Sequence, residues 1–194
     1  MRGGRLLVLG CLVAIGSLSV GPAAGAAQEK YRRTVEDYTV PDVTLVDQDG
    51  EKVNLRALAS SEKPVLLDFI YGTCTTICPV LSAGYAYFQR KMGEAAADKA
   101  VLISISIDPD HDTPLIMTDY LRRYGAKPGW EFLTGKREDV IQVMYAFDAY
   151  VENKMNHYPL TLLRAPGSDR WIRIYGLIGG KDLMREYERL AGDP

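Results

Sequence analysis

Runs of apolar residues alternate along the chain with segments whose apolar positions recur every three or four residues. Five of the runs have the length and largely apolar character of buried strands. They are residues 65–70, 101–107, 130–133, 160–164 and 171–175. The last two flank the turn sequence Pro-Gly-Ser-Asp at 166–169, which predicts that they pair antiparallel. A shorter hairpin is expected earlier, where residues 43–46 and 53–55 flank Asp49-Gly50.

The segments between the runs have the periodicity of helices with one buried face. Their predicted inner faces carry Leu81, Tyr85, Phe88 and Met92; Ile116, Tyr120 and Tyr124; Val140, Met144 and Phe147; and Leu183, Tyr187 and Leu190. Proline stands at the expected start of two of them, at Pro79 and Pro114. Strand, helix, strand and helix, then an antiparallel pair and a last helix, is the order of an α/β thioredoxin-like fold. Such a fold has a central mixed sheet flanked by helices, here with an N-terminal extension.

The N-terminal segment predicts export. Residues 1–26 combine Arg2 and Arg5 with an apolar stretch at 6–20 and small residues after it, which is the pattern of a secretory signal. An uncleaved membrane anchor and lipidation at Cys11 are the two alternatives. We therefore expect an exported, periplasmic protein, tethered to the inner membrane if this segment is retained.

Composition favours one domain after this signal. Polar residues of mixed charge predict a linker at 27–40, followed by a thioredoxin-like domain at 41–194. The chain of 194 residues, 47% hydrophobic and 25% charged, is long enough for a single core. Removal of residues 1–26 takes away two of the 23 Lys and Arg residues against 25 Asp and Glu, so the net charge moves from -2 to about -4. No basic patch remains to suggest nucleic acid as a partner.

Export also changes which cysteines remain in the protein. Cys11 leaves with the predicted signal, so Cys74 and Cys78 become the only pair, in a compartment that permits disulfides. Because the pair lies between the run 65–70 and the helix begun by Pro79, we expect Cys78 near the helix cap and Cys74 in the preceding loop. The free N–H groups of a helix start favour thiolates. The pair can therefore close a disulfide or bind a soft metal.

The available donors limit which metal the pair would bind. Two thiolates favour copper(I) or zinc, and a structural zinc site requires four protein ligands. The mature chain could supply four only by adding both His111 and His157. Two cysteines and one histidine suit copper, and His157 lies before the strand at 160–164, on a loop that faces the first helix in a thioredoxin-like fold. A hydrogen-bonded loop histidine is the alternative for His157.

His111 lies in an acidic loop with the sequence Asp-Pro-Asp-His-Asp-Thr-Pro at 108–114. A solvated loop histidine is the simpler interpretation there. Asp108 and Asp110 could contact a cation, but we expect them to shape the turn at the end of the strand.

Four motifs follow one another along the chain. They are Phe-Ile-Tyr-Gly-Thr-Cys-Thr-Thr-Ile-Cys-Pro at 69–79, Asp-Pro-Asp-His-Asp-Thr-Pro at 108–114, Trp-Glu-Phe-Leu-Thr-Gly at 130–135 and Asn-His-Tyr-Pro-Leu at 156–160. In this order, over most of residues 40–190, the chain resembles the Sco/SenC family of copper-binding, thioredoxin-like proteins. Cys-x-x-x-Cys-Pro alone is weakly specific, whereas its combination with Asp-Pro-x-x-Asp-Thr-Pro and the histidine is fairly specific. Many family members have Thr-His directly before the first cysteine, where this chain has Gly72-Thr73.

The resemblance implies a protein that assists assembly of the dinuclear copper centre of cytochrome c oxidase, by delivering copper, by reducing thiols, or by both. Cys74 and Cys78 match the two copper thiolates of the family, and His157 matches the third ligand. The implied cofactor is copper, as Cu(I) or Cu(II). The implied partners are the copper-bearing subunit of cytochrome c oxidase or another periplasmic copper protein, and a thiol reductant.

Three functions without copper are alternatives. A thiol:disulfide oxidoreductase would cycle Cys74 and Cys78 as a redox-active pair, acting on cysteines of a copper protein. Ordinary thioredoxins separate their cysteines by two residues, so the three here argue modestly against a general reductase. A peroxiredoxin-like peroxidase would share the spacing of Thr75 and Cys78, but Tyr71 stands where peroxidases have proline. A purely structural disulfide would close a loop too short to stabilise the fold much.

Overall fold

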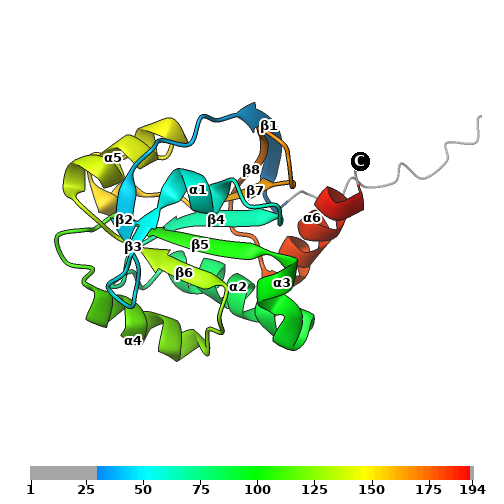
Figure 1. Ribbon diagram of the computed structural model, residues 1–194, viewed down its shortest axis with the longest axis horizontal. Helices are drawn as coiled ribbons and strands as arrows, with labels where there is room; N and C mark the ends of the chain where they lie inside the picture. Colours follow the sequence, from blue (N-terminus) through cyan, green and yellow to red (C-terminus); the bar gives the residue numbers. More distant parts are fainter. Residues whose placement is uncertain (1–29, 193–194) are drawn as a thin grey trace, which may run out of the picture.

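A six-stranded sheet forms the middle of the molecule (Figure 1), whose computed structural model describes residues 30–192. The strands lie in the order β1-β8-β7-β4-β5-β6. Their bounds are β1 Arg32–Asp37, β4 Val65–Ile70, β5 Val101–Ser106, β6 Trp130–Leu133, β7 Leu160–Arg164 and β8 Arg170–Tyr175. β4 pairs parallel with β5 and antiparallel with β7, so the parallel and antiparallel halves of the sheet meet at this strand.

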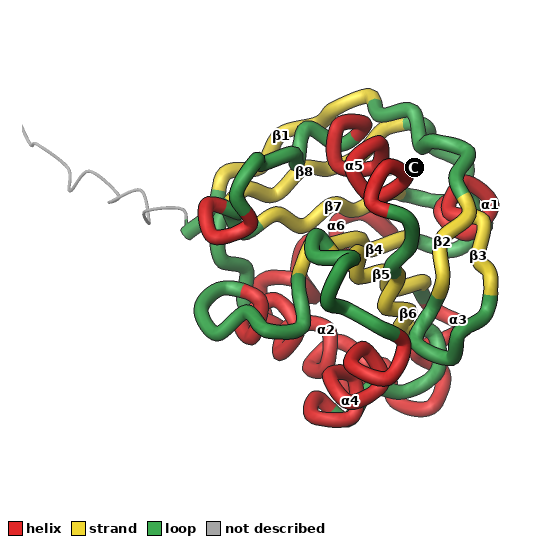
Figure 2. The backbone as a smooth tube through the Cα atoms, turned by 90° about the vertical axis from the view of Figure 1, so that its left-hand side faces the viewer, coloured by secondary structure: helices red, strands yellow, loops and turns green. Residues whose placement is uncertain are grey.

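Helices cover both faces of the sheet (Figures 1 and 2). They are α1 (Leu55–Ala59), α2 (Cys78–Met92), α3 (Ala96–Lys99), α4 (Pro114–Tyr124), α5 (Arg137–Ala146) and α6 (Gly180–Gly192), with 3-10 helices η1 (Gly93–Ala95) and η2 (Lys154–Asn156). α2, α4 and α6 share one buried cluster with Leu66 and Ile70 of β4, and α1 and α5 share a second with Val65, Leu67 and Phe69. This division follows the two-residue period of a strand.

The predicted elements are present. A hairpin of β2 (Thr44–Val46) and β3 (Lys52–Asn54) pairs antiparallel, as expected, and β7 pairs antiparallel with β8. α2 begins one residue before Pro79 and ends beside Gly93. A mixed sheet between helices therefore confirms the predicted thioredoxin-like fold.

The inner face of α4 differs from the prediction. Ile116 is 37% exposed, whereas Met117, Tyr120 and Leu121 are buried. Both sets of residues have helical spacing, so periodicity alone fits either one. The packing of α4 against α2 decides between them, since the Tyr120 hydroxyl lies 2.7 Å from the Ser82 hydroxyl.

The predicted linker at 27–40 is wrong for residues 32–37, which form the edge strand β1. This strand pairs antiparallel with β8, from Arg32 opposite Tyr175 to Asp37 opposite Arg170. Its sequence, Arg-Arg-Thr-Val-Glu-Asp, is polar because one edge of the strand is unpaired and no side chain is fully buried. Main-chain hydrogen bonds rather than apolar side chains hold it, so composition carried no signal for it.

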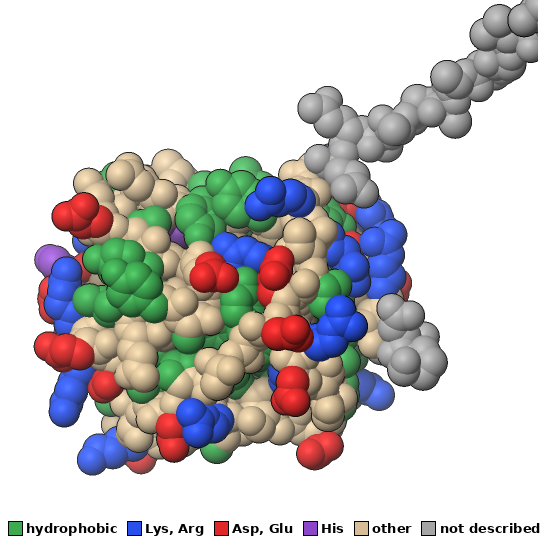
Figure 3. Space-filling view, turned by 90° about the horizontal axis from the view of Figure 1, so that it is seen from above, with side chains coloured by type: hydrophobic (Ala, Val, Ile, Leu, Met, Phe, Trp, Pro, Cys, Tyr) green, Lys and Arg blue, Asp and Glu red, His purple; other side chains and the backbone are tan. Residues whose placement is uncertain are grey.

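The predicted export signal at 1–26 lies outside the described residues. Within residues 30–192, no helix combines the length and the apolar character needed to cross a membrane. The face seen in Figure 3 carries hydrophobic side chains among acidic and basic ones, with the two charge signs interspersed.

Asp68 is an unusual buried residue on β4. It is fully buried, and neither of its carboxylate oxygens has a hydrogen-bond partner within residues 30–192. Burial raises the pKa of this carboxyl group to about 7, and Ser104, opposite it on β5, opposes the shift only in part. The Ser104 hydroxyl also accepts a hydrogen bond from the Trp130 indole at 3.0 Å.

Gly129→Ala is expected to lower the free energy of unfolding by about 2–5 kcal/mol. Gly129 has φ +90°, and a Cβ there would lie 2.8 Å from the Cα atom of Ala97. The left-handed backbone costs about 1–2 kcal/mol for another residue, and overpacking about 1–3 kcal/mol more. Gly125→Ala is the matched control, because Gly125 has φ +62° with nothing within 4 Å of the added methyl group. Urea unfolding of both variants would contradict the argument if their losses were equal.

Candidate metal centre

The loop after β4 is tied to the loop after β5. The Asp112 carboxylate accepts hydrogen bonds from the Gly72 N–H, at 3.1 Å to each oxygen, and from the Ser106 hydroxyl at 2.5 Å. A Cβ at position 72 would lie 2.8 Å from an Asp112 oxygen, so this approach requires glycine. Asp112 was not among the predicted site residues, although its loop belongs to one of the four motifs. It fixes the backbone two residues before Cys74.

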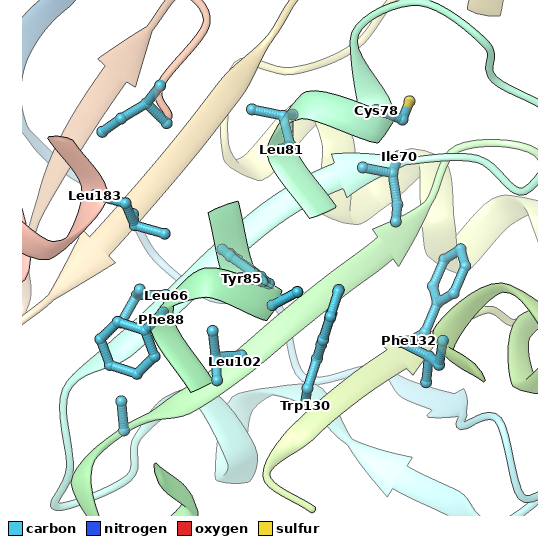
Figure 4. Close-up of a cluster of buried hydrophobic side chains, with 14 of the residues drawn as sticks. Leu66, Ile70, Cys78, Leu81, Tyr85, Phe88, Leu102, Trp130, Phe132 and Leu183 are labelled. Atoms are coloured by element: carbon cyan, nitrogen blue, oxygen red, sulfur yellow. The ribbon is translucent and has the colours of Figure 1, made fainter. Parts of the chain in front are cut away.

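Both thiols lie at the N-terminal end of α2 (Figure 4 labels Cys78). Cys74 is 7% exposed and Cys78 is fully buried, and neither forms a disulfide. The Cys74 N–H donates to the Tyr71 carbonyl at 3.1 Å, which folds the loop back toward β4. The Cys78 N–H donates to the Cys74 Sγ atom at 3.4 Å. The start of the helix thus holds the two cysteines together, as their spacing predicted.

The two thiols have opposite acid–base behaviour. Burial acts to raise the pKa of Cys74, but hydrogen bonds with the Cys78 thiol and with the N–H groups of Thr76 and Cys78 outweigh it, and the pKa falls below its usual value. Burial raises the pKa of Cys78, and the contact with Cys74 raises it further. The expectation that the helix start favours thiolate is therefore wrong for Cys78. Full burial outweighs the helix N-terminus there.

His157 contacts Cys78 although the two residues are 79 positions apart in the sequence. It follows η2 directly, and its Nε2 atom lies 3.5 Å from the Cys78 Sγ atom. Burial lowers the pKa of His157 to about 4, so the ring is neutral at neutral pH with a nitrogen lone pair free to bind. The Tyr71 ring packs edge-on against it at 6.0 Å between centroids. Cys74, Cys78 and His157 therefore share one end of β4.

These contacts are pairwise. Among residues 30–192, no three His, Cys, Asp or Glu side chains already have the spacing of a metal site. To bind one shared ion, the Cys74 and His157 side chains would have to move closer to Cys78.

The acidic loop behaves as a structural turn. His111 is exposed, and its Nδ1 atom lies 3.0 Å from Asp108 rather than against either thiol. Asp110 pairs with Arg137 at 2.6 Å, and Asp108 also pairs with Lys154 of η2. Asp108 thus links this loop to the short helix that carries His157.

Tyr71 is a second residue that sequence reasoning missed as part of the site. It is 5% exposed, and its hydroxyl donates to the Met155 Sδ atom at 3.6 Å. The Lys154 ammonium lies 5.4 Å from its ring centroid. Its position three residues before Cys74 was the available signal, but the sequence does not indicate which segments it contacts.

Comparison with known protein families gives a match over more than half of the chain. The model of the SCO1/SenC family matches residues 32–163, which is more than half of the chain. The chain belongs to the SCO1/SenC family. The resemblance seen in the four motifs is thereby confirmed.

Relatives within the family share both sequence and fold. The SCO1 protein homolog of Bacillus subtilis is 33% identical over 119 residues, which span 60% of this chain and 60% of that protein. The structure of Bradyrhizobium japonicum ScoI with copper bound has a TM-score of 0.61 and 28% identity, covering 78% of this chain and 99% of that one. BsSco, described as a member of the Sco family of cytochrome c oxidase assembly proteins with a disulfide switch, has a TM-score of 0.65 and 26% identity. The match covers 81% of this chain and 96% of the BsSco chain.

Proposed function

We propose that this SCO1/SenC protein is a copper metallochaperone that binds one copper ion through Cys74, Cys78 and His157. The observation that carries the proposal is the 3.5 Å contact between Cys78 Sγ and His157 Nε2, two atoms 79 residues apart in sequence, beside the second thiol. Thiolates and a neutral imidazole are soft or intermediate donors that suit copper(I). A relative of 28% identity, ScoI, was solved with copper bound, which supports copper as the ion.

The donors differ in what they release on binding. His157 is neutral, since its pKa is about 4, and the pKa of Cys74 is lowered, so protons compete less for these two donors than for an ordinary imidazole and thiol. Cys78 keeps its proton, because its pKa is raised by burial and by Cys74. Copper binding would displace that proton, and the affinity should therefore rise with pH.

The role we propose is assistance in assembling the dinuclear copper centre of cytochrome c oxidase. The copper would pass to the copper-bearing subunit of that enzyme or to another periplasmic copper protein, and a thiol reductant would keep Cys74 and Cys78 reduced. This proposal includes export by residues 1–26, with cleavage or retention as a membrane tether.

A metal-independent thiol:disulfide oxidoreductase is the second candidate. The lowered pKa of Cys74 favours it, because the thiolate is the attacking group in disulfide exchange. In this reaction Cys74 attacks a substrate disulfide, Cys78 then displaces the substrate thiol, and two electrons pass to the substrate as Cys74–Cys78 forms. The 3.4 Å contact from the Cys78 N–H to Cys74 Sγ holds the two residues at the same helix end.

The reduced protein is expected to retain one copper(I) per chain, and the oxidised protein to retain essentially none. A disulfide between Cys74 and Cys78 leaves no thiolate for the metal, so two of the three ligands are lost. Protein purified under anaerobic conditions would be titrated against a chromogenic copper(I) chelator, with its thiol count measured beside the metal content. Copper retention that does not depend on the thiol count would place the site elsewhere. Absence of copper from fully reduced protein would favour the oxidoreductase.

A further inference from the structure

Met155 is an exposed methionine at the edge of the thiol site. Its side chain is 71% exposed, and it lies in η2, two residues before His157. A single exposed apolar side chain is common on protein surfaces. Met155 differs because its sulfur atom is held by the rest of the site.

Two contacts fix its position. The Tyr71 hydroxyl donates to Met155 Sδ at 3.6 Å, and the Met155 N–H donates to the Asn153 side-chain oxygen at 2.9 Å. Lys154, in the same 3-10 helix, pairs with Asp108, which secures η2 to the loop after β5. These contacts anchor the backbone of η2 and place the Met155 sulfur atom beside the Tyr71 hydroxyl.

Tyr71 places this sulfur atom next to the other donors. Its ring packs edge-on against the His157 ring. The Cys74 N–H donates to the Tyr71 carbonyl at 3.1 Å. Tyr71 thus contacts His157, the Cys74 backbone and the Met155 thioether.

The two thiols are too deeply buried to take copper directly from a partner protein. Cys78 is fully buried and Cys74 is 7% exposed, so a copper ion held by a partner protein cannot meet both thiols at once from solvent. A thioether is a soft ligand that favours copper(I) and is not protonated at any physiological pH.

We propose that Met155 is an outer copper(I) ligand that carries the ion between a partner protein and the Cys74–Cys78–His157 site. This inference rests on the proposed copper-binding function. Transfer is a ligand exchange without electron transfer. A bond from copper to Met155 Sδ forms as a partner ligand leaves, and it breaks as the Cys74 thiolate and then Cys78 bind, with the Cys78 proton going to solvent. Release to an acceptor follows the same steps in reverse.

Met155→Leu tests this role, because leucine keeps the apolar volume and removes the sulfur. We expect the rates of copper(I) uptake and release, measured by stopped flow with a chromogenic chelator, to fall about tenfold, the equivalent of about 1.4 kcal/mol. The equilibrium affinity should change less than about threefold, or about 0.7 kcal/mol, because the inner ligands remain. Met92→Leu is the matched control, since Met92 lies at the opposite end of α2 from Cys78.

A direct readout distinguishes ligation from a packing effect. The 13C-methyl resonance of Met155, identified by its absence in Met155→Leu, should shift when copper(I) is added to the Cys78→Ser variant, in which the ion cannot pass on to a complete inner site, while that of Met92 stays in place. Wild-type rates in Met155→Leu, or an unmoved Met155 resonance, would overturn the role of Met155 while wild-type protein still retains copper. Wild-type protein that retains no copper at all would overturn the proposed function and this inference together.

Discussion

Cys74→Ser and Cys78→Ser are each expected to lower the copper(I) affinity of the reduced protein by more than about a hundredfold. Loss of a residue that merely orients a metal ligand already costs 10–100-fold in affinity, and a serine hydroxyl is a hard donor that copper(I) disfavours. Cys78 should be the more sensitive position. Its Sγ atom contacts His157 Nε2, so the change removes a thiolate and also the thiol contact to the third ligand.

His157→Ala is expected to weaken copper(I) binding less than either cysteine change, because the imidazole is neutral and the two thiolates remain. His111→Ala is the matched control, since His111 is exposed and contacts Asp108 instead of a thiol. Competition against a copper(I) chelator ranks the four variants on one scale. Wild-type copper retention by the double variant Cys74→Ser, His157→Ala would eliminate the three-ligand site, and equal losses in the two histidine variants would remove His157 from it.

The second large effect is a dependence of stability on pH that comes from Asp68. Its pKa is about 7 in the folded protein against a usual value of 3.8. Between these values the folded state holds the proton and the unfolded state does not, so the free energy of unfolding falls as pH rises. A difference of about three pKa units corresponds to roughly 4 kcal/mol. That is a large fraction of the 5–15 kcal/mol that stabilises a typical domain.

Asp68→Asn should remove this dependence, because the amide does not titrate. Urea unfolding at intervals from pH 4 to pH 8 is the measurement, with the difference between variant and wild type plotted against pH. The variant should gain on wild type steadily up to about pH 7, with no further change above it. Asp49→Asn, at an exposed residue of the β2-β3 turn, provides the control. Parallel curves for Asp68→Asn and wild type would contradict a buried, protonated Asp68.

Asp68 also lies close enough to affect the site. Its charge adds, after burial and Cys74, to the raised pKa of Cys78. The Asp68 carboxyl group and the Cys78 thiol thus each make it harder for the other to lose its proton. The same pH series, repeated for copper(I) affinity, would measure that coupling.

Local patterns were enough to predict most of the secondary structure. Neighbouring residues alone produce the apolar runs of β4, β5, β7 and β8 and the spacing of apolar residues in α2 and α6. These patterns can therefore be recognised before the fold is known. The position of the Cys74–Cys78 pair could be predicted in the same way, because a loop followed by Pro79 places both thiols at a helix start. The four motifs also identified the family.

Tertiary structure decided what depends on distant partners. β1 exists because β8 offers it a main-chain edge, and α4 turns Met117 inward because α2 packs there. The two histidines were equivalent in type, yet only His157 approaches a thiol, since β7 returns beside β4 and brings the preceding loop with it. Packing in the core cluster buries Cys78, and this burial raises its pKa. The donors are a property of the amino-acid sequence alone, whereas the pairing of the strands brings His157 to the cysteines.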